Sequence, residues 1–233
     1  MSEAPADAAA VARRLREAAR DGDVAAQYLL GQMHLEGRGV ALDPQEGLHW
    51  YQLAASAGHA LAMNMVGRCH ELGRGTPVNL ELAAAWYRRA AECGLDWGQY
   101  NYAQLLAKGR GVPEDRARAL ALYRLAAGQG HAKSMNLVGR HYDEGWLVER
   151  DPAAARDWYR RAAEGGDFRG QCSYASVLAL AGEIDEAVAW LRKAAQTATP
   201  AFLDQLKASL AGSPIASLRA LGATLPDGAA AVG

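Results

Sequence analysis

Two pairs of polar side chains recur in this sequence with the same internal spacing. Asn64 and Arg68 are four residues apart, and Asn136 and Arg140 repeat them 72 residues later, within the nearly identical segments AMNMVGR and SMNLVGR. An asparagine amide offers both donors and an acceptor to a peptide backbone group. A guanidinium group can bind a carboxylate through two parallel hydrogen bonds. The pattern therefore predicts that these side chains hold an extended peptide.

The three cysteines, Cys69, Cys93 and Cys172, are predicted to be free thiols. If Cys69 and Cys93 lie on two antiparallel helices of one repeat, about 15 Å of helix separates them at about 1.5 Å per residue. A disulfide requires Cα atoms less than about 7 Å apart. Unpaired thiols are typical of a reducing compartment. The first residues also lack the basic start and apolar run of a signal peptide, so we expect a cytoplasmic protein.

The six histidines do not have the spacing to cysteine or carboxylate that a metal site needs. His34 and His70 occupy the place in the repeat that Tyr142 has elsewhere, which indicates packing residues. His59 and His131 follow glycines that end helices, so we expect them in turns. We therefore predict no metal site.

Motifs for catalysis or cofactor binding are also missing from the sequence. The glycines of residues 37–40 are not followed by the Gly-Lys-Ser/Thr of a phosphate-binding loop. Neither Gly-x-Ser-x-Gly nor His-Glu-x-x-His occurs. We predict no catalytic residue and no cofactor.

The residues that must position the Asn and Arg side chains recur every 36 residues. A small residue marks the centre of each repeat: Gly31, Gly67, Ala103 and Gly139. A tyrosine follows each centre at a constant distance: Tyr51, Tyr87, Tyr123 and Tyr159. A fixed period of this length, with small and aromatic residues in phase, is the sequence signature of a helical solenoid.

Each repeat is predicted to contain two antiparallel helices, A and B. In helix A, positions four apart carry small, apolar and large residues on one face, and paired glycines such as Gly37 and Gly39 end it. An N-cap residue then begins helix B: Asp43, Asn79, Asp115 and Asp151. Glu46 is expected to complete a capping box with Asp43. The Trp-Tyr pairs of helix B, such as Trp86 and Tyr87, are expected in the core.

This pattern resembles the Sel-1-like repeat, a longer relative of the tetratricopeptide repeat. The resemblance covers roughly residues 10–196 and consists of Ala-x-x-x-Leu-Gly-x-x-His/Tyr-x-x-Gly-x-Gly-Val, a capping Asp, and Trp-Tyr-x-x-Ala-Ala-x-x-Gly. It implies an all-α fold, a right-handed α-α superhelical solenoid of about eleven to thirteen helices. It also implies a scaffold or adaptor for protein–protein interaction, without enzymatic activity.

Two other functions remain open. One is a hydrolase-like activity, because the cysteine-rich branch of the family has been associated with β-lactam binding. The cysteine framework of that branch is absent here. The other is a structural role through self-association, although we favour a monomer.

The domain organisation follows from where the repeat pattern begins, shortens and ends. We expect a disordered N-terminus (1–9), an N-terminal capping half repeat (10–22), four 36-residue repeats (23–166), a shortened fifth repeat (167–196), a C-terminal capping helix (197–211) and a partly disordered tail (212–233).

In tetratricopeptide-like folds helix A lines the concave groove, so the resemblance implies a binding surface there. Positions three before and one after each centre are expected to face it: Tyr28, Gln32, Asn64, Arg68, Tyr100, Gln104, Asn136 and Arg140. The tyrosines would add apolar contact between the polar groups. The expected partner is another protein or an extended peptide.

The charge balance narrows the range of partners further. The formal net charge is −1 and 22% of the residues are charged. A nucleic acid or an anionic membrane would favour a basic excess. No stretch approaches the roughly 20 apolar residues of a membrane span, so we expect neither kind of partner.

Overall fold

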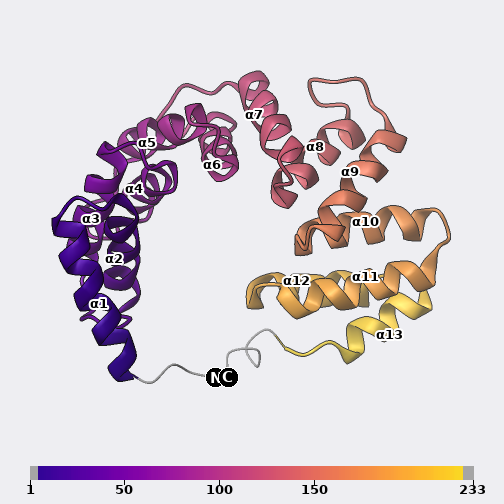
Figure 1. Ribbon diagram of the computed structural model, residues 1–233. Helices are drawn as coiled ribbons and strands as arrows, with labels where there is room; N and C mark the ends of the chain where they lie inside the picture. Colours follow the sequence, from indigo (N-terminus) through magenta and orange to yellow (C-terminus); the bar gives the residue numbers. More distant parts are fainter. Residues whose placement is uncertain (1–4, 228–233) are drawn as a thin grey trace. The chain divides into compact units, whose positions relative to one another are not determined.

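The computed structural model describes residues 5–227 of the chain, which form thirteen α-helices and no strand within that range (Figure 1). This confirms the all-α prediction and the expected number of helices. The chain divides into two compact units, one ending at Ala126 and the other beginning at Ala127. The division falls in the last turn of one helix, and each unit is described by itself below.

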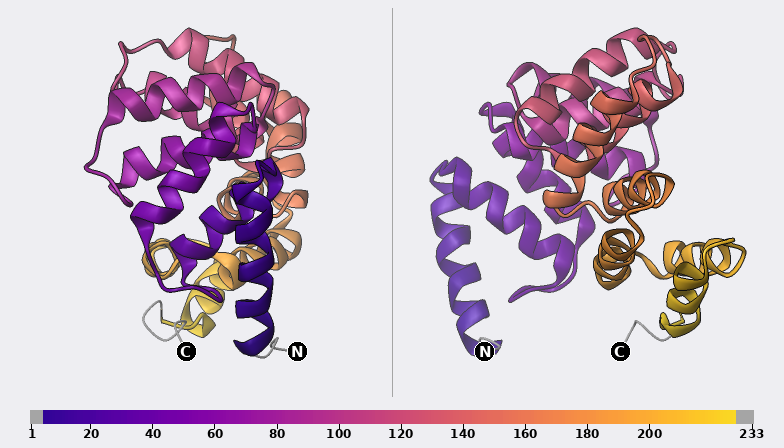
Figure 2. Two further views of the ribbon diagram at one scale, coloured as in Figure 1. Left: turned by 60° about the vertical axis from the view of Figure 1, so that its left-hand side comes forward. Right: turned by 90° about the vertical axis from the view of Figure 1, so that its right-hand side faces the viewer.

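The first unit is a stack of helices in which each helix from α1 to α6 packs on its neighbour along the chain. Its helices are α1 (Pro5–Arg20), α2 (Val24–Glu36), α3 (Pro44–Ser56), α4 (Ala60–Leu72), α5 (Leu80–Glu92), α6 (Asp96–Leu106) and most of α7 (Arg116–Gly128). The A helices of the first three repeats are α2, α4 and α6, and in Figure 1 and Figure 2 they follow one side of this stack.

Helix ends follow the predicted punctuation, with one exception. Gly73 ends α4 with a left-handed φ of 71°, and the Asn79 side chain accepts a hydrogen bond from the Leu82 backbone N–H at the start of α5. The expected capping box at Glu46 is not formed. The Asp43 N–H donates to the His34 carbonyl instead, and the Glu46 carboxylate accepts from the Trp50 indole at 2.9 Å. The capping-box prediction was wrong because both groups have other partners.

The second glycine of the turn in the first three repeats packs directly on the start of the helix that precedes helix A of its own repeat. Gly75 has a φ of 74°, and a Cβ there would overlap the Pro44 carbonyl in the first turn of α3. Gly39 approaches the backbone of Ala8 in the same way. This contact lies on the first turns of α1, which begins at Pro5, earlier than the expected end of the N-terminal disorder at residue 9. Residues 1–4 of that segment lie outside the described range.

The core of the first unit depends on the central glycine of helix A. Tyr87 is 1% exposed, and a Cβ added to Gly67 would lie only 2.8 Å from the Tyr87 ring. The glycine therefore makes room for the tyrosine of helix B. The tryptophan before it is less buried than expected, because Trp86 is half-buried and the Arg89 guanidinium lies 4.4 Å from its ring centroid. The core prediction holds for Tyr87 but not for Trp86.

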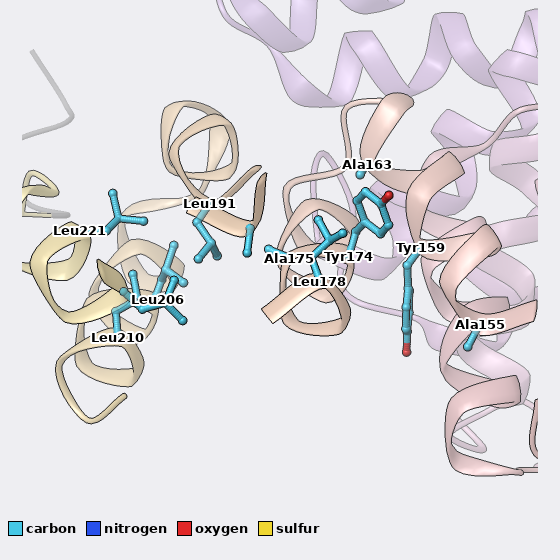
Figure 3. Packing of buried hydrophobic residues seen from close by; sticks show 12 residues of the cluster. Ala155, Tyr159, Ala163, Tyr174, Ala175, Leu178, Leu191, Leu206, Leu210 and Leu221 are labelled. Carbon is cyan, nitrogen blue, oxygen red and sulfur yellow. The ribbon is translucent and has the colours of Figure 1, made fainter. Parts of the chain in front are cut away.

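The second unit continues the helix pairs and ends in two capping helices. Its helices are α8 (Ala132–Glu144), α9 (Pro152–Glu164), α10 (Phe168–Leu180), α11 (Ile184–Thr197), α12 (Pro200–Ala211) and α13 (Ala216–Thr224). Figure 3 shows the buried side chains that hold them together, among them Tyr159, Tyr174, Leu191 and Leu206. Residues 167–196, which were predicted to be a shortened fifth repeat, contain α10 and α11. Residues 228–233 of the predicted tail lie outside the described range.

We expect the two aromatic residues of one Trp-Tyr pair to differ in their effect on stability. Tyr87→Ala should lower the free energy of unfolding by about 3–5 kcal/mol, as other large-to-small core substitutions do. Trp86→Ala should lower it by less, because its ring is half-buried. Urea denaturation of the full chain followed by circular dichroism measures both. An equal or larger loss for Trp86→Ala would contradict this account of the core.

Candidate peptide-binding face of the A helices

The exposed side of α2, α4 and α6 in the first unit is called the A face here. It includes the side chains six before and one after each repeat centre, of which Ala25, Leu61, Arg68 and Trp97 are exposed and Gln32 and Gln104 are half-buried. Positions three before each centre lie nearer to the neighbouring helices and are half-buried or buried. The structure thus brings six of the predicted residues onto one side of the unit, but with unequal exposure.

The two predicted tyrosines are fixed by aromatic packing. The Tyr28 ring lies 5.5 Å from the Tyr51 ring and 4.9 Å from the His59 ring. The Tyr100 ring lies 6.1 Å from the Trp97 ring. Both tyrosines are half-buried, so they offer a partner rigid apolar contact at little entropic cost.

Asn64 joins two neighbouring A helices. It is only 8% exposed, and its Oδ1 accepts a hydrogen bond of 2.9 Å from the Asn101 amide. Within the described range, the amide nitrogen of Asn64 is not a buried donor left without a partner. The Asn64 acceptor is therefore used inside the fold, and what it can still offer a partner is its N–H donors.

Arg68 is an exposed cation without a counter-ion. Within the described part of the chain no carboxylate lies at ion-pair distance from it. The nearby carboxylate of Glu71 already accepts from the Tyr87 hydroxyl at 2.8 Å and pairs with Arg110 at 3.5 Å. Burial raises the pKa of Tyr87, Glu71 raises it further, and the Arg68 charge opposes both. The Arg68 guanidinium thus faces solvent beside a buried hydroxyl and is free to bind an anion.

The glutamines one position after the centres behave differently from Arg68. Gln32 donates from its amide to the Glu36 carboxylate at 3.0 Å, and Glu36 also pairs with Arg38 at 2.6 Å. Gln104 is half-buried on α6. Neither glutamine carries charge, so Arg68 is the one cationic group among the six predicted residues of the first unit.

The second unit holds the other predicted pair. Asn136 is 6% exposed and its Oδ1 is enclosed without a hydrogen-bond partner. Arg140 is exposed and its guanidinium lies 5.3 Å from the Trp146 ring centroid. The Tyr159 hydroxyl donates to Asp143 at 3.3 Å. Within its own unit this pair therefore repeats the combination of a buried amide and an exposed cation.

The predicted set of binding residues leaves out three residues of the A face. Leu61 and Trp97 are each 41% exposed and occupy the first turns of α4 and α6. Asn101 completes the hydrogen bond with Asn64. The sequence contained the signal for Leu61 and Trp97. The positions six before and one after a repeat centre are seven residues apart, so they share one side of a helix.

The histidines and cysteines have structural roles in this fold. His59 is the N-cap of α4, where its Nδ1 accepts from the Ala62 N–H at 3.1 Å. Burial raises the pKa of the Cys69 thiol to about 11, so it stays protonated and is a poor nucleophile. Within residues 5–227 no cluster of three His, Cys, Asp or Glu side chains is arranged to hold a metal ion.

The sequence matches the Sel1 repeat over residues 24–59, 60–95, 98–131, 132–167 and 182–196. Each of the first four matches covers a helix pair of the structure, and the fifth covers α11. The chain belongs to the Sel1 repeat family. Proteins of this family generally act as scaffolds for protein interactions and are typically not enzymes. A comparison with curated proteins found no match.

Solved structures support the same assignment. A Sel1 repeat protein from Oxalobacter formigenes is 27% identical with a TM-score of 0.74, and the similarity covers 85% of each chain. The protective antigen c5321 of uropathogenic Escherichia coli is 28% identical with a TM-score of 0.72. That similarity covers 87% of this Sel1 repeat chain but only 44% of c5321. A putative Sel1 repeat protein from Klebsiella pneumoniae, 19% identical with a TM-score of 0.52, shares the fold alone; the match covers 78% of this chain and 91% of that one.

No helix between residues 5 and 227 has both the length and the apolar character needed to cross a membrane.

Unfolding should depend on pH through His70. Burial lowers the pKa of His70 below its ordinary value of 6.5, and its Nδ1 is enclosed without a partner. The unfolded chain then binds a proton more readily than the folded one, so this contribution to stability is complete above about pH 6.5 and is lost as the pH falls through the folded pKa.

The variant His70→Leu tests this pH dependence, because Leu106 fills the same position in the next repeat. We expect the free energy of unfolding of His70→Leu to fall less between pH 7 and pH 5 than that of the wild type, measured by urea denaturation at each pH. Identical pH profiles would show that His70 does not contribute.

Proposed function

We propose that this Sel1 repeat protein is a non-enzymatic scaffold that binds an extended segment of a partner protein along the A face of its first unit. The observation that carries the proposal is Arg68, an exposed guanidinium without a counter-ion in the described part of the chain. An unpaired arginine fork between polar and aromatic side chains is suited to a carboxylate of a partner. The general role of Sel1 repeats in protein interactions supports the same function.

The remaining predicted residues have different roles in this proposal. Tyr28 and Tyr100 supply rigid aromatic surface, and Gln32 and Gln104 add polar contacts at the rim. Asn136 and Arg140 provide a similar cationic contact in the second unit. Asn64 contributes through its N–H groups, because its acceptor is bonded to Asn101.

A hydrolase-like function has less support from the same residues. The Cys69 and Cys172 thiols have pKa values raised by burial, to about 11 and about 12. Protonated thiols are weak nucleophiles at neutral pH. Interaction through the A face therefore accounts better for the observed side chains.

Site-specific photo-cross-linking tests which side of the stack binds the partner. A photoreactive amino acid is placed at Gln104 on the A face or, as a control, at the exposed Arg88 of helix B in α5. We expect the partner to be cross-linked from position 104 and not from position 88. Cross-linking from position 88 alone would move binding to the B helices and overturn the proposal.

The affinity for the partner identified by cross-linking provides a second test of the proposal. Arg68→Ala combined with Arg140→Ala should weaken binding at least about tenfold, or about 1.4 kcal/mol, in a calorimetric titration. The helical circular dichroism signal and the melting temperature should stay unchanged, because both side chains are exposed.

A further inference from the structure

Three pairs of side chains lie in order along the neighbouring helices α4 and α6. The first pair is Leu61 and Trp97 in the first turns, the second is Asn64 and Asn101, and the third is Arg68 and Gln104. The hydrogen bond between Asn64 and Asn101 shows that the two helices lie side by side at the middle pair. The A face therefore changes along α4 and α6 from apolar to amide to cationic, and we call these six residues the α4–α6 strip.

The apolar end of the strip is accessible to a partner. Leu61 and Trp97 are each 41% exposed. The Trp97 ring is held edge-on at 6.1 Å from the Tyr100 ring. A pre-oriented tryptophan beside an exposed leucine is the kind of surface on which an apolar side chain of a partner gains most from burial.

The middle of the strip is suited to bind a backbone group of the ligand rather than one of its side chains. The Asn101 amide nitrogen and the Asn64 oxygen bond to each other, which leaves Asn64 N–H donors and the Asn101 oxygen for a ligand. These groups match the C=O and N–H of a peptide unit. A partner helix would have its own backbone groups already bonded, so this pair suits an extended segment.

The cationic end determines the direction of the ligand. Arg68 lacks a counter-ion in the described chain. At the opposite end the Asp96 carboxylate accepts from the Trp97 N–H at 2.7 Å, and its charge disfavours an acidic group there. A ligand with one apolar and one acidic side chain therefore binds with its acidic side chain at Arg68.

The helix geometry gives the spacing of those two side chains. Leu61 and Arg68 are seven residues apart on α4, which corresponds to about 10 Å at about 1.5 Å per residue. A polyproline II peptide rises about 3.1 Å per residue with about three residues per turn, so residues i and i+3 lie on one side about 9 Å apart. In a β-strand, residues i and i+3 point to opposite sides.

We propose that the α4–α6 strip binds a polyproline II segment in which an apolar residue and an Asp or Glu are three positions apart. This inference rests on the proposed function and specifies its ligand. The polyproline II backbone has no internal hydrogen bonds, so its peptide groups are available to the two asparagines. The acidic side chain neutralises the unpaired charge of Arg68 through two parallel hydrogen bonds.

Synthetic peptides test the spacing directly. Each peptide has a Pro- and Ser-rich frame with one Leu and one Glu, made in both orders, at a separation of two, three or four residues. Binding to the full chain is measured by fluorescence anisotropy. The separation of three should give the highest affinity, by at least about tenfold over the others. Equal affinities, or tighter binding of a helical peptide with a separation of seven, would overturn the inference.

Charge exchange tests the orientation. Arg68→Glu should weaken binding of the Leu–Glu peptide at least about tenfold and should strengthen binding of a Leu–Lys peptide of the same spacing. The matched control is Arg88→Glu, another exposed arginine, which should leave both affinities unchanged. Loss of binding by both peptides with Arg68→Glu would contradict a direct contact with the acidic residue.

The apolar end has its own matched pair of variants. Leu61→Ala should weaken the binding of every peptide regardless of its charged residue, whereas Leu53→Ala on α3 should not. The two leucines are matched in exposure, since Leu53 is 39% exposed and Leu61 is 41% exposed. If no peptide shows these effects while position 104 still cross-links the partner, the proposed function stands and only the ligand assignment fails. If position 88 cross-links instead, both fail.

Discussion

The close approach of a helix B tyrosine to a glycine of helix A is the contact on which three of the four full repeats of this Sel1 repeat structure depend, and Ala103 takes the place of the glycine in the third repeat. The space beside Gly67 is filled by the Tyr87 ring, and Tyr51 fills the space beside Gly31 in the same way. A methyl group at either glycine would overlap the ring, so the two helices of a repeat can pack at this distance only without it. This contact fixes the rotation of helix A and thereby determines which of its residues reach the solvent.

The A face follows from that rotation. With the glycine side turned toward helix B, a side of α4 that lies about 100–120° around the helix carries Leu61 and Arg68. The residues between these two sides meet the neighbouring A helix, as Asn64 does. One side of each helix therefore stabilises its own repeat, one joins adjacent repeats, and the third is free for interaction.

Charge is distributed unevenly among these surfaces. Several arginines of the described chain pair with carboxylates, such as Arg156 with Glu183 or Arg160 with Asp157 and Glu164. Exposed pairs of this kind contribute little to stability. Arg68 has no such partner in the described chain, and a cation left beside fixed aromatic rings has more to gain from a ligand than from the fold.

The sequence by itself determined the repeat, the helix boundaries and the family, because glycine, tyrosine and N-cap residues recur in phase and each has a local physical cause. It also identified Arg68 and Arg140 as exposed. Only the tertiary structure decided that Asn64 is bonded to Asn101, that Glu46 bonds Trp50 rather than closing a capping box, and that Trp86 is half-buried. These outcomes depend on contacts between neighbouring helices and on competition between hydrogen-bond partners, and the spacing of residues along one helix does not contain that information.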